Sequence, residues 1–326
     1  MLRRTLLAAP ALIPLAARAQ APWPARPVSI VVPFTPGGST DIATRILAER
    51  LGPKLGPEVR IIVENRAGAG GSLGADLVRR AAPDGHMLLM ATASSHGSNP
   101  AALPASTPYN PVEDFTAVAM VGGGPLVIVV PGRSPHRTIQ ELWTAMRARP
   151  GALSFATSGA GGIGHLTGAY MLARAGGLAA EHIPYRGGAQ VLAAMAAGEV
   201  EWSSEVFASA VPHLRDGTSR GLAVTGATRH PLMPAIPTLQ EAGLAGFEVT
   251  TWNLLLGPKG LPAPIVARLN AAIAEILAEA PVRARMEAAG VDPAAPAPPA
   301  TAESFLRAEL AKFQEIVRVS DLRLGR

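Results

Sequence analysis

Residues 28–41 read VSIVVPFTPGGSTD, and this stretch decides the fold prediction. The apolar run Val28–Phe34 has the length and the β-branched composition of a buried strand. A turn rich in proline and glycine follows, and apolar residues then recur at helical spacing between positions 42 and 51. Ser39 or Thr40 is placed to cap this helix. The stretch therefore predicts a strand, a glycine turn and a helix in succession.

The same unit recurs along the chain in two rounds. The first round continues with predicted strands at residues 60–64 and 86–92 and a helix between them. In the second round, strand Leu153–Thr157 leads into the glycine-rich turn 158–164 and a helix from His165. Further strands are predicted at 182–185, 200–204 and 221–225. Strands that alternate with helices at this spacing predict two α/β lobes, each with a mostly parallel, doubly wound sheet.

The pattern changes between the two rounds. Gly122-Gly123-Gly124 interrupts two apolar stretches, Ala117–Val121 and Leu126–Val130. Near the end of the chain, two amphipathic helices flank the Pro/Ala-rich linker Asp292–Ala300, and we expect them to pack back onto the first lobe. The predicted division is a leader at 1–19, a first lobe from 22–125 plus 250–326, and a second lobe from 126–249.

Composition excludes several classes of protein. The 326-residue chain has no cysteine, which excludes a disulfide scaffold, thiolate metal sites and a cysteine nucleophile. Its seven histidines show no metal-ligand spacing, so we predict no metal site. Charged residues make up 16% of the chain, below the roughly 25% of an average domain. With a formal net charge of only +5, the chain is not expected to bind nucleic acid.

The first residues resemble an export signal. Arg3-Arg4 precedes the short apolar run Thr5–Ala17, and Ala17-Arg18-Ala19 forms a small-residue cleavage site. The adjacent arginines suit the twin-arginine route as well as the general secretory route. Cleavage after Ala19 would remove three of the 29 Lys and Arg residues, leaving 26 − 24 = +2. The basic excess therefore belongs mostly to the leader.

The turn Gly159–Gly164 fits the G-x-G-x-x-G fingerprint of dinucleotide-binding proteins. That fingerprint is normally followed by an acidic residue at the end of the next strand, whereas the strand 182–185 ends in Arg186. An exported NAD(P)-binding oxidoreductase is therefore the alternative hypothesis. The sequence favours an anion site built from the same backbone amides, with no cofactor.

Two glycine turns, Pro36–Asp41 and Ser158–Gly164, open helices in the two predicted lobes. Each offers unpaired N–H groups and the positive end of a helix dipole. If both turns face one cleft, they form a two-sided site for an anion that needs no arginine.

The motifs that carry a family resemblance run in order along the mature chain. They are residues 30–41 with Arg45, Val63–Gly71, Pro83-Asp84-Gly85, Asp114-Phe115, Ser158-Gly159 with His165-Leu166, Pro184–Gly187, Gly198–Val200, Pro237-Thr238 with Glu241 and Gly243, and Trp252. Together they resemble the Bug family, the periplasmic substrate-binding proteins of tripartite tricarboxylate transporters. The resemblance implies a two-lobed, type II periplasmic binding-protein fold that closes on a small carboxylate. It also implies a non-catalytic, monomeric protein that delivers its ligand to a two-subunit membrane permease.

The resemblance also implies which residues bind the ligand. In the family, the loop Phe34–Asp41 and the turn at Ser158 hold the ligand carboxylates, partly through ordered waters. Polar residues just after the third strand are further candidates for the cleft. The predicted ligand-binding residues are Phe34, Gly37, Gly38, Ser39, Thr40, Asp41, Thr92, Ser94, Ser95, Thr157, Ser158, Gly159, Gly161, Gly162, His165, Tyr185 and Glu205.

Two positions depart from the family pattern. Gly162 stands where the family often has serine or threonine, so a hydroxyl is expected to be lost from the second turn. Glu205 stands where a shorter acidic residue is common. A carboxylate there would disfavour a second ligand carboxylate but could bind an amino group. The ligand therefore stays open among a dicarboxylate, an amino acid and a neutral aromatic acid derivative.

Overall fold

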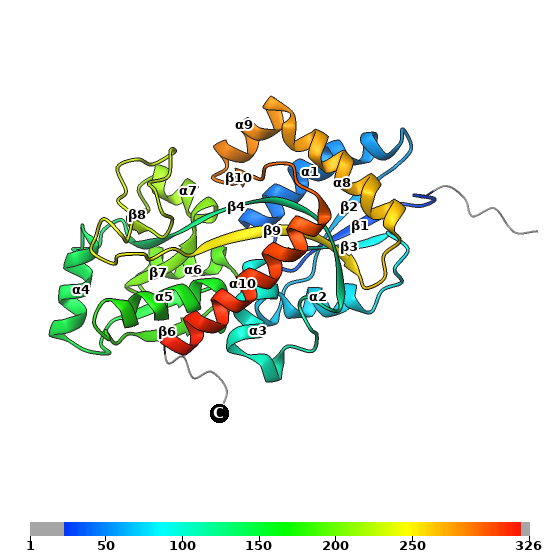
Figure 1. Ribbon diagram of the computed structural model, residues 1–326. Helices are drawn as coiled ribbons and strands as arrows, with labels where there is room; N and C mark the ends of the chain where they lie inside the picture. Colours follow the sequence, from blue (N-terminus) through cyan, green and yellow to red (C-terminus); the bar gives the residue numbers. More distant parts are fainter. Residues whose placement is uncertain (1–22, 321–326) are drawn as a thin grey trace, which may run out of the picture.

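The computed structural model describes residues 23–320, which form two α/β lobes side by side (Figure 1). The predicted leader at 1–19 lies outside these residues. The strands follow one another across the molecule in the order β2-β1-β3-β9-β4-β7-β5-β6. Within residues 23–320, no helix is both long enough and apolar enough to cross a bilayer.

The first lobe contains the strand–turn–helix unit on which the prediction rests. Its early elements are β1 (Val28–Val32), α1 (Ser39–Leu55), β2 (Ile61–Asn65), α2 (Ser72–Arg79), β3 (Met87–Thr92) and the short α3 (Asn99–Ala102). Strand β1 pairs in parallel with β2 and β3, as predicted. The sheet is completed by β9 (Thr250–Pro258), which runs antiparallel between β3 and β4. The sequence pattern did not predict β9.

The second lobe repeats the unit. Its elements are α4 (Ile139–Ala148), β5 (Ser154–Thr157), α5 (Ile163–Arg174), β6 (Glu181–Pro184), α6 (Gly188–Ala197), β7 (Trp202–Val206), α7 (Phe207–Arg215) and β8 (Ser219–Val224). Strand β5 is parallel to β6 and β7. The predicted strands at 182–185, 200–204 and 221–225 are therefore present with shifts of one or two residues, whereas α7 was not predicted.

Strand β4 (Phe115–Pro131) runs without a break through both lobes. It pairs with β9 as far as Pro125 and with β7 and β8 from Leu126 onward. The two apolar stretches around Gly122-Gly123-Gly124 thus belong to one strand. The glycines are needed because a Cβ on Gly123 would collide with the backbone carbonyl of Thr251 on β9.

A buried hydroxyl ties the two segments that cross between the lobes. Leu126 N–H donates to Thr225 Oγ1 (2.8 Å), and the same hydroxyl donates to Val249 O (2.6 Å). Thr225 is fully buried. Its side chain therefore fixes the spacing of β4 and the segment that enters β9 at the point where the chain changes lobe.

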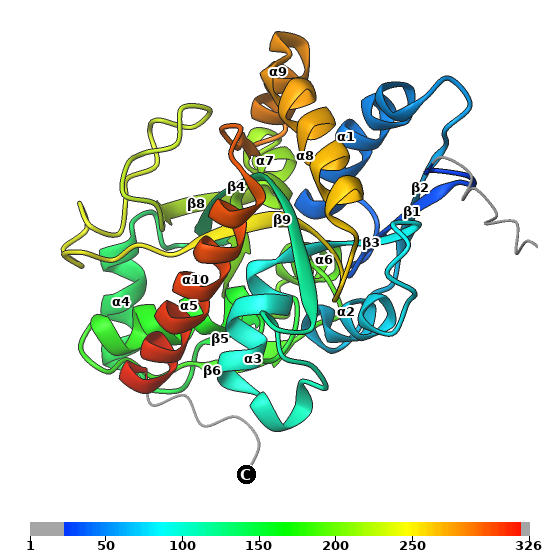
Figure 2. The same ribbon diagram turned by 45° about the vertical axis from the view of Figure 1, so that its right-hand side comes forward.

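The C-terminal helices only partly follow the prediction. Helix α8 (Ala263–Ala278) packs on α1 in the first lobe, as expected, and so does α9 (Ala280–Ala288), which was not predicted. The two-residue strand β10 (Asp292–Pro293) pairs with β4. Helix α10 (Pro299–Val319) lies over β4 and α3 but also contacts α5 of the second lobe (Figure 2). It is anchored by Trp252 Nε1–H, which donates to Glu309 Oε2 at 3.0 Å.

Candidate functional site

A small polar cavity lies between the lobes. Its volume is about 60 Å³, which is room for only a few water molecules. Both predicted glycine turns border it, one from each lobe. The lining residues are Phe34, Thr35, Gly38, Ser39, Thr40, Asp41, Thr92, Ser94, Ser158, Ile163, Gly187, Gly188, Glu205, Val206, Ser209 and Thr251. Nine of the predicted ligand-binding residues are in this set.

The first turn leads into α1 without a side-chain cap of its own. The N-cap is Gly38, with extended backbone (φ −78°, ψ 168°), and neither Ser39 nor Thr40 caps the helix as predicted. The capping hydroxyl comes from the other lobe, because Ser39 N–H donates to Ser209 Oγ at 3.4 Å. Gly38 leaves the approach to this helix end open, since a Cβ there would meet only Thr35 O, at 3.8 Å.

Asp41 holds the first turn in place rather than remaining free for a ligand. Its carboxylate accepts hydrogen bonds from Gly37 N (3.0 Å), Arg45 Nε (2.9 Å) and Asn65 Nδ2 (2.9 Å). Burial by itself would raise the pKa of Asp41, but these three donors outweigh it and hold the pKa below its usual value. Gly37 does not line the cavity and acts through this bond. Asp41 is therefore an ionised residue whose charge is already balanced.

The second turn shows the same arrangement. Helix α5 has the N-cap Gly162, again without a side-chain cap. Its first amide, Ile163 N–H, donates to Ser94 Oγ of the first lobe at 3.0 Å. Ser94 Oγ lies 3.7 Å from the position that a Cβ on Gly162 would occupy. The hydroxyl expected to be lost at Gly162 is therefore supplied from across the cleft.

His165 supports the second turn from behind. Its Nδ1 accepts a hydrogen bond from Gly161 N at 3.2 Å, and its ring stacks on His182 with centroids 3.6 Å apart. His182 Nε2 in turn lies 2.7 Å from Thr157 Oγ1. Burial lowers the pKa of His165 to about 3 and that of His182 to about 4, so both rings are neutral at physiological pH. Thr157 and His165 thus shape the turn and do not line the cavity.

Thr92 and Ser95 have different roles although both follow β3. Thr92 borders the cavity. Ser95 is fully buried and turned inward, where its hydroxyl accepts from Thr92 N (3.1 Å) and lies 3.0 Å from His96 Nδ1. The sequence pattern could not separate the two residues, because it shows only that both come after the strand.

A wider hollow of about 800 Å³ adjoins the cavity. Phe34, Thr35 and Ser158 line both spaces and so form the wall between them. Gly159 and Tyr185, both predicted to bind ligand, lie in this outer space, where the hydroxyl of Tyr185 donates to Glu199 (3.3 Å). Gly161 faces Leu103 and Asn99 of the first lobe instead.

The cavity also contains residues that sequence reasoning missed. They are Thr35, Ile163, Gly187, Gly188, Val206, Ser209 and Thr251. Thr35 and Ile163 adjoin predicted motifs, and Gly187 closes a motif that carried the family resemblance. No sequence signal pointed to Ser209 or Thr251, because α7 and β9 were not predicted.

The dinucleotide hypothesis finds no support in the second turn. The turn does join a strand to a helix, as the fingerprint requires. However, a Cβ on Gly161 would lie 2.6 Å from Leu103 Cδ1 and 2.8 Å from Asn99 Oδ1. Side chains of the first lobe thus occupy the space over the turn where a pyrophosphate would have to bind.

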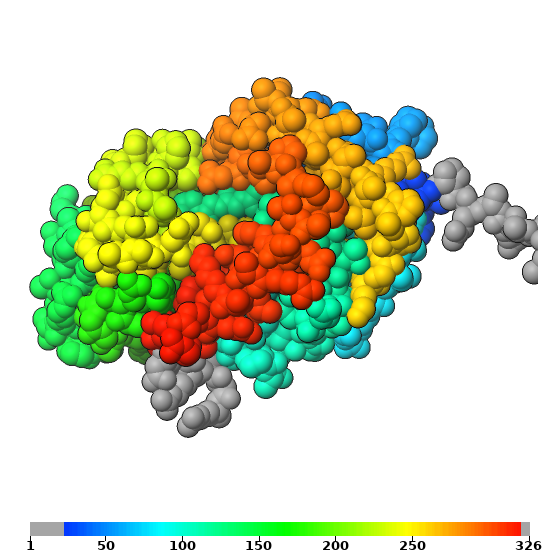
Figure 3. All heavy atoms as spheres, viewed as in Figure 1, coloured from blue at the N-terminus to red at the C-terminus, as the bar shows by residue number. Residues whose placement is uncertain are grey.

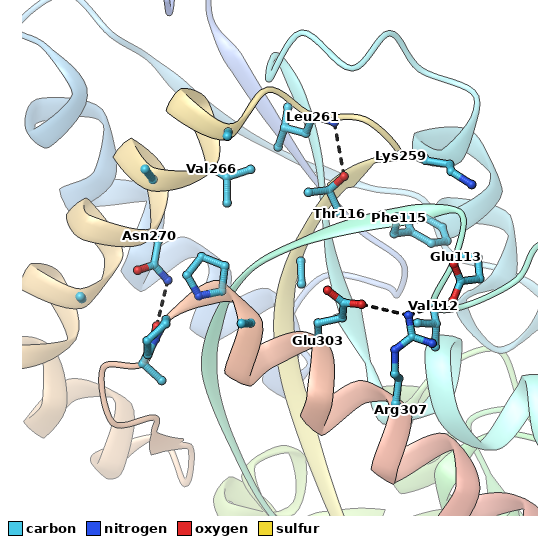
Figure 4. Close-up of a pocket in the computed structure, with 18 of the residues that line it drawn as sticks. Val112, Glu113, Phe115, Thr116, Lys259, Leu261, Val266, Asn270, Glu303 and Arg307 are labelled. Carbon is cyan, nitrogen blue, oxygen red and sulfur yellow. Dashed lines mark hydrogen bonds and ion pairs between the residues drawn. The ribbon is translucent and has the colours of Figure 1, made fainter.

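Two further hollows lie outside the cleft. One, of about 450 Å³, exposes the glycine segment of β4, which shows green between the yellow and orange surfaces in Figure 3. The other, of about 970 Å³, lies among α8, α10 and the start of β4 (Figure 4). Its polar groups pair mainly with one another, as in Arg307–Glu303 (2.9 Å) and Asn270–Ala297 (3.0 Å). Between residues 23 and 320, no group of three His, Asp or Glu side chains could hold a metal ion.

Two α/β lobes joined by crossing strands, with a polar cavity between them, define a binding protein that can close on a small ligand. The chain belongs to the tripartite tricarboxylate transporter receptor family, whose TctC model matches residues 43–322. It is 35% identical over 302 residues to BugT of Bordetella pertussis (strain Tohama I), covering 93% of this chain and 91% of BugT.

Solved structures agree with this assignment. The R. palustris protein Rpa4515 with adipate superposes with a TM-score of 0.87 at 30% identity, over 92% of this chain and 98% of that one. MatC from Rhodopseudomonas palustris with bound malate gives a TM-score of 0.85 at 32% identity, over 90% and 100% of the two chains. The predicted family and two-lobed fold are thereby confirmed.

Proposed function

We propose that this protein is a periplasmic, non-catalytic solute-binding protein that captures a small carboxylate for a tripartite tricarboxylate-type transporter. One observation carries the proposal: the N-termini of α1 and α5 border one cavity from opposite lobes. Each helix end favours an anion by about 0.3–1 kcal/mol, and by up to ~2 kcal/mol when partly buried. The adipate and malate bound by its relatives are anions of this kind.

The lining chemistry supports the same ligand class. Among residues 23–320, the lining includes the hydroxyls of Thr35, Ser39, Thr40, Thr92, Ser94, Ser158, Ser209 and Thr251 but no lysine or arginine. Direct and water-bridged hydrogen bonds from these groups would hold the carboxylate. The ligand class comprises dicarboxylates, amino acids and related organic acids.

Capture would proceed by hinge closure. We propose the lobes predicted above, 22–125 plus 250–326 and 126–249, as the moving bodies. Strand β4 pairs with β9 up to Pro125 and with β7 from Leu126 onward, and this change of neighbouring strand supports the division. A ligand that contacts both lobes favours the closed form by its additional contacts there.

The mature protein would act in the periplasm after export by the general secretory or twin-arginine route and cleavage after Ala19. It would work as a monomer and release its ligand to a two-subunit membrane permease. Family membership supports the transport role.

A backbone substitution at Gly38 tests the proposal. Gly38 has φ −78°, which suits proline, and Gly38→Pro removes one N–H at the mouth of the α1 turn. The mature protein and its variants would be titrated with malate, adipate, aspartate and glutamate in a thermal-shift screen. Ligand at a hundredfold its Kd should stabilise the wild type by about 2.7 kcal/mol.

The matched control is Gly38→Ala, which keeps the N–H and whose Cβ fits without a clash. We expect Gly38→Ala to bind like the wild type and Gly38→Pro to lose at least tenfold in affinity. If none of the carboxylates raises the Tm of the wild type, the ligand class is wrong. If folded Gly38→Pro binds normally, the α1 turn is not part of the site.

A further inference from the structure

Two carboxyl groups face the cavity between the lobes, Asp41 from α1 and Glu205 from β7. The elements packed around Glu205 add no other titratable group to the lining. Strand β4 places Val127 beside it, α6 contributes Gly188 and α7 contributes Ser209. The charge of Asp41 is balanced by Arg45 (2.9 Å). Glu205 is thus the one lining side chain whose charge state is open.

Glu205 has no cationic partner among residues 23–320. It is 3% exposed, and its carboxyl contacts a single polar side chain, Ser203 Oγ, at 3.4 Å from Oε1. The fold makes room for the group, because a Cβ on Gly188 would lie 2.9 Å from Oε2. An ionised carboxylate in this place would be a buried and uncompensated charge.

Counting protons at Ser203 indicates which atom is the donor. Ser203 Oγ lies 2.8 Å from Ala156 O, a carbonyl that can only accept, so the single hydroxyl proton of Ser203 is used there. Ser203 then has only lone pairs to offer Glu205. At 3.4 Å the contact between Ser203 Oγ and Glu205 Oε1 is also long for an O–H···O hydrogen bond, so it offers little compensation for a negative charge on the carboxyl. Burial acts in the same direction and raises the pKa of Glu205 to about 8.

We propose that Glu205 is a specificity-determining residue that acts in its protonated form, donating its O–H to a carboxylate of the bound anion and disfavouring a ligand ammonium at that end of the cavity. This inference rests on the proposed function and narrows it. The proton stays on Glu205, no covalent bond changes, and the buried pair carries one negative charge. The sequence left open whether a carboxylate or an amino group of the ligand lies beside Glu205, and a protonated Glu205 favours the carboxylate.

Calorimetric titration of the mature protein with malate and adipate between pH 6 and 9 tests the inference. Wild-type affinity should fall about tenfold from pH 7 to 9, because Glu205 loses its proton over this range. Glu205→Gln keeps a neutral donor of similar shape, so it should bind within a few-fold of the wild type at pH 7 and show no loss at pH 9. Glu201→Gln, on the same segment but exposed, should retain the wild-type pH profile.

A wrong assignment of Glu205 and a wrong ligand class would give different binding results. If neither dicarboxylate binds the wild type at any pH while aspartate or glutamate binds more tightly as the pH rises, Glu205 acts as an anion and the inference is overturned. A dicarboxylate affinity that is unchanged from pH 6 to 9 in the wild type also overturns it, while leaving the carboxylate-binding function intact. If no carboxylate of any kind binds, the proposed function itself is wrong.

Discussion

Ser94 Oγ accepts a hydrogen bond from Ile163 N–H across the cleft, at 3.0 Å. The acceptor follows β3 in the first lobe, and the donor is the first amide of α5 in the second lobe. The reciprocal contact joins Ser39 N–H of the first lobe to Ser209 Oγ of the second, at 3.4 Å. Each lobe therefore caps a helix of the other, and both caps must break when the lobes separate.

Ser94→Ala should destabilise the closed form of the protein, in which the cap is made, by about 1 kcal/mol, the usual cost of losing an N-cap hydroxyl. The reason is that Ile163 N–H would lose its acceptor in a buried position. Urea denaturation measures the change. Ser98→Ala is the control, since Ser98 is also buried and its hydroxyl has no partner within residues 23–320. Equal losses in both variants would refute a role for the cap.

Asp41→Asn should lower the free energy of unfolding by about 1–3 kcal/mol at pH 7. The carboxylate accepts from three donors through two oxygens, whereas an asparagine amide has one oxygen and would turn its NH2 group toward at least one of these donors. The pKa of Asp41 is lowered on folding, so its ionisation stabilises the protein above about pH 4, and this contribution is lost as the pH falls through the folded value. The difference between wild type and variant should therefore shrink at pH 3. Chemical denaturation at both pH values measures it, and a constant difference would contradict the assignment.

Thr225→Val should destabilise the protein by about 1–3 kcal/mol, because Leu126 N–H and Val249 O would lose a buried partner where the chain passes between the lobes. Thr225→Ser keeps the hydroxyl and should lose much less. If Thr225→Ser proves more destabilising than Thr225→Val in thermal unfolding, the methyl group supports the crossing more than the hydrogen bonds do.

Glu205→Gln should stabilise the ligand-free protein above neutral pH. The pKa of Glu205 is raised on folding from 4.5 to about 8, so wild-type stability is full below about pH 4.5 and falls as the pH rises through 8. The loss over this range is on the order of a few kcal/mol. Tm measured from pH 5 to 9 should fall in the wild type and stay flatter in Glu205→Gln; parallel curves would show that Glu205 does not titrate there.

The elements that the sequence predicted are those determined by local pattern. The strand, turn and helix of residues 28–55 follow from a short apolar run, a glycine turn and helical periodicity. Strand β9 could not be predicted in the same way, because its residues become a strand only between β3 and β4, far away in the chain. The single strand through Gly122–Gly124 likewise depends on the close approach of β9.

In the candidate site, too, the features with a local sequence motif were predicted and the contacts made from the opposite lobe were not. The two glycine turns were found from the sequence because each carries its own motif. The partners that cap them, Ser94 and Ser209, come from the opposite lobe, and no local pattern links them to those helices. The sequence likewise placed Glu205 near the cleft without showing that it is buried and has no cationic partner in the part of the chain that the structure describes.

The position of β9 also sets an order of folding. Strand β9 fills the gap between β3 and β4, and all of β5–β8 precedes it in the chain. The first sheet therefore cannot close until the chain has been synthesised as far as residue 258. Until then β3 and β4 present unpaired edges, which invite association with other chains. In a chain that ends before β9, the second lobe could still form. The first lobe would keep the unpaired edges of β3 and β4 and would need a chaperone.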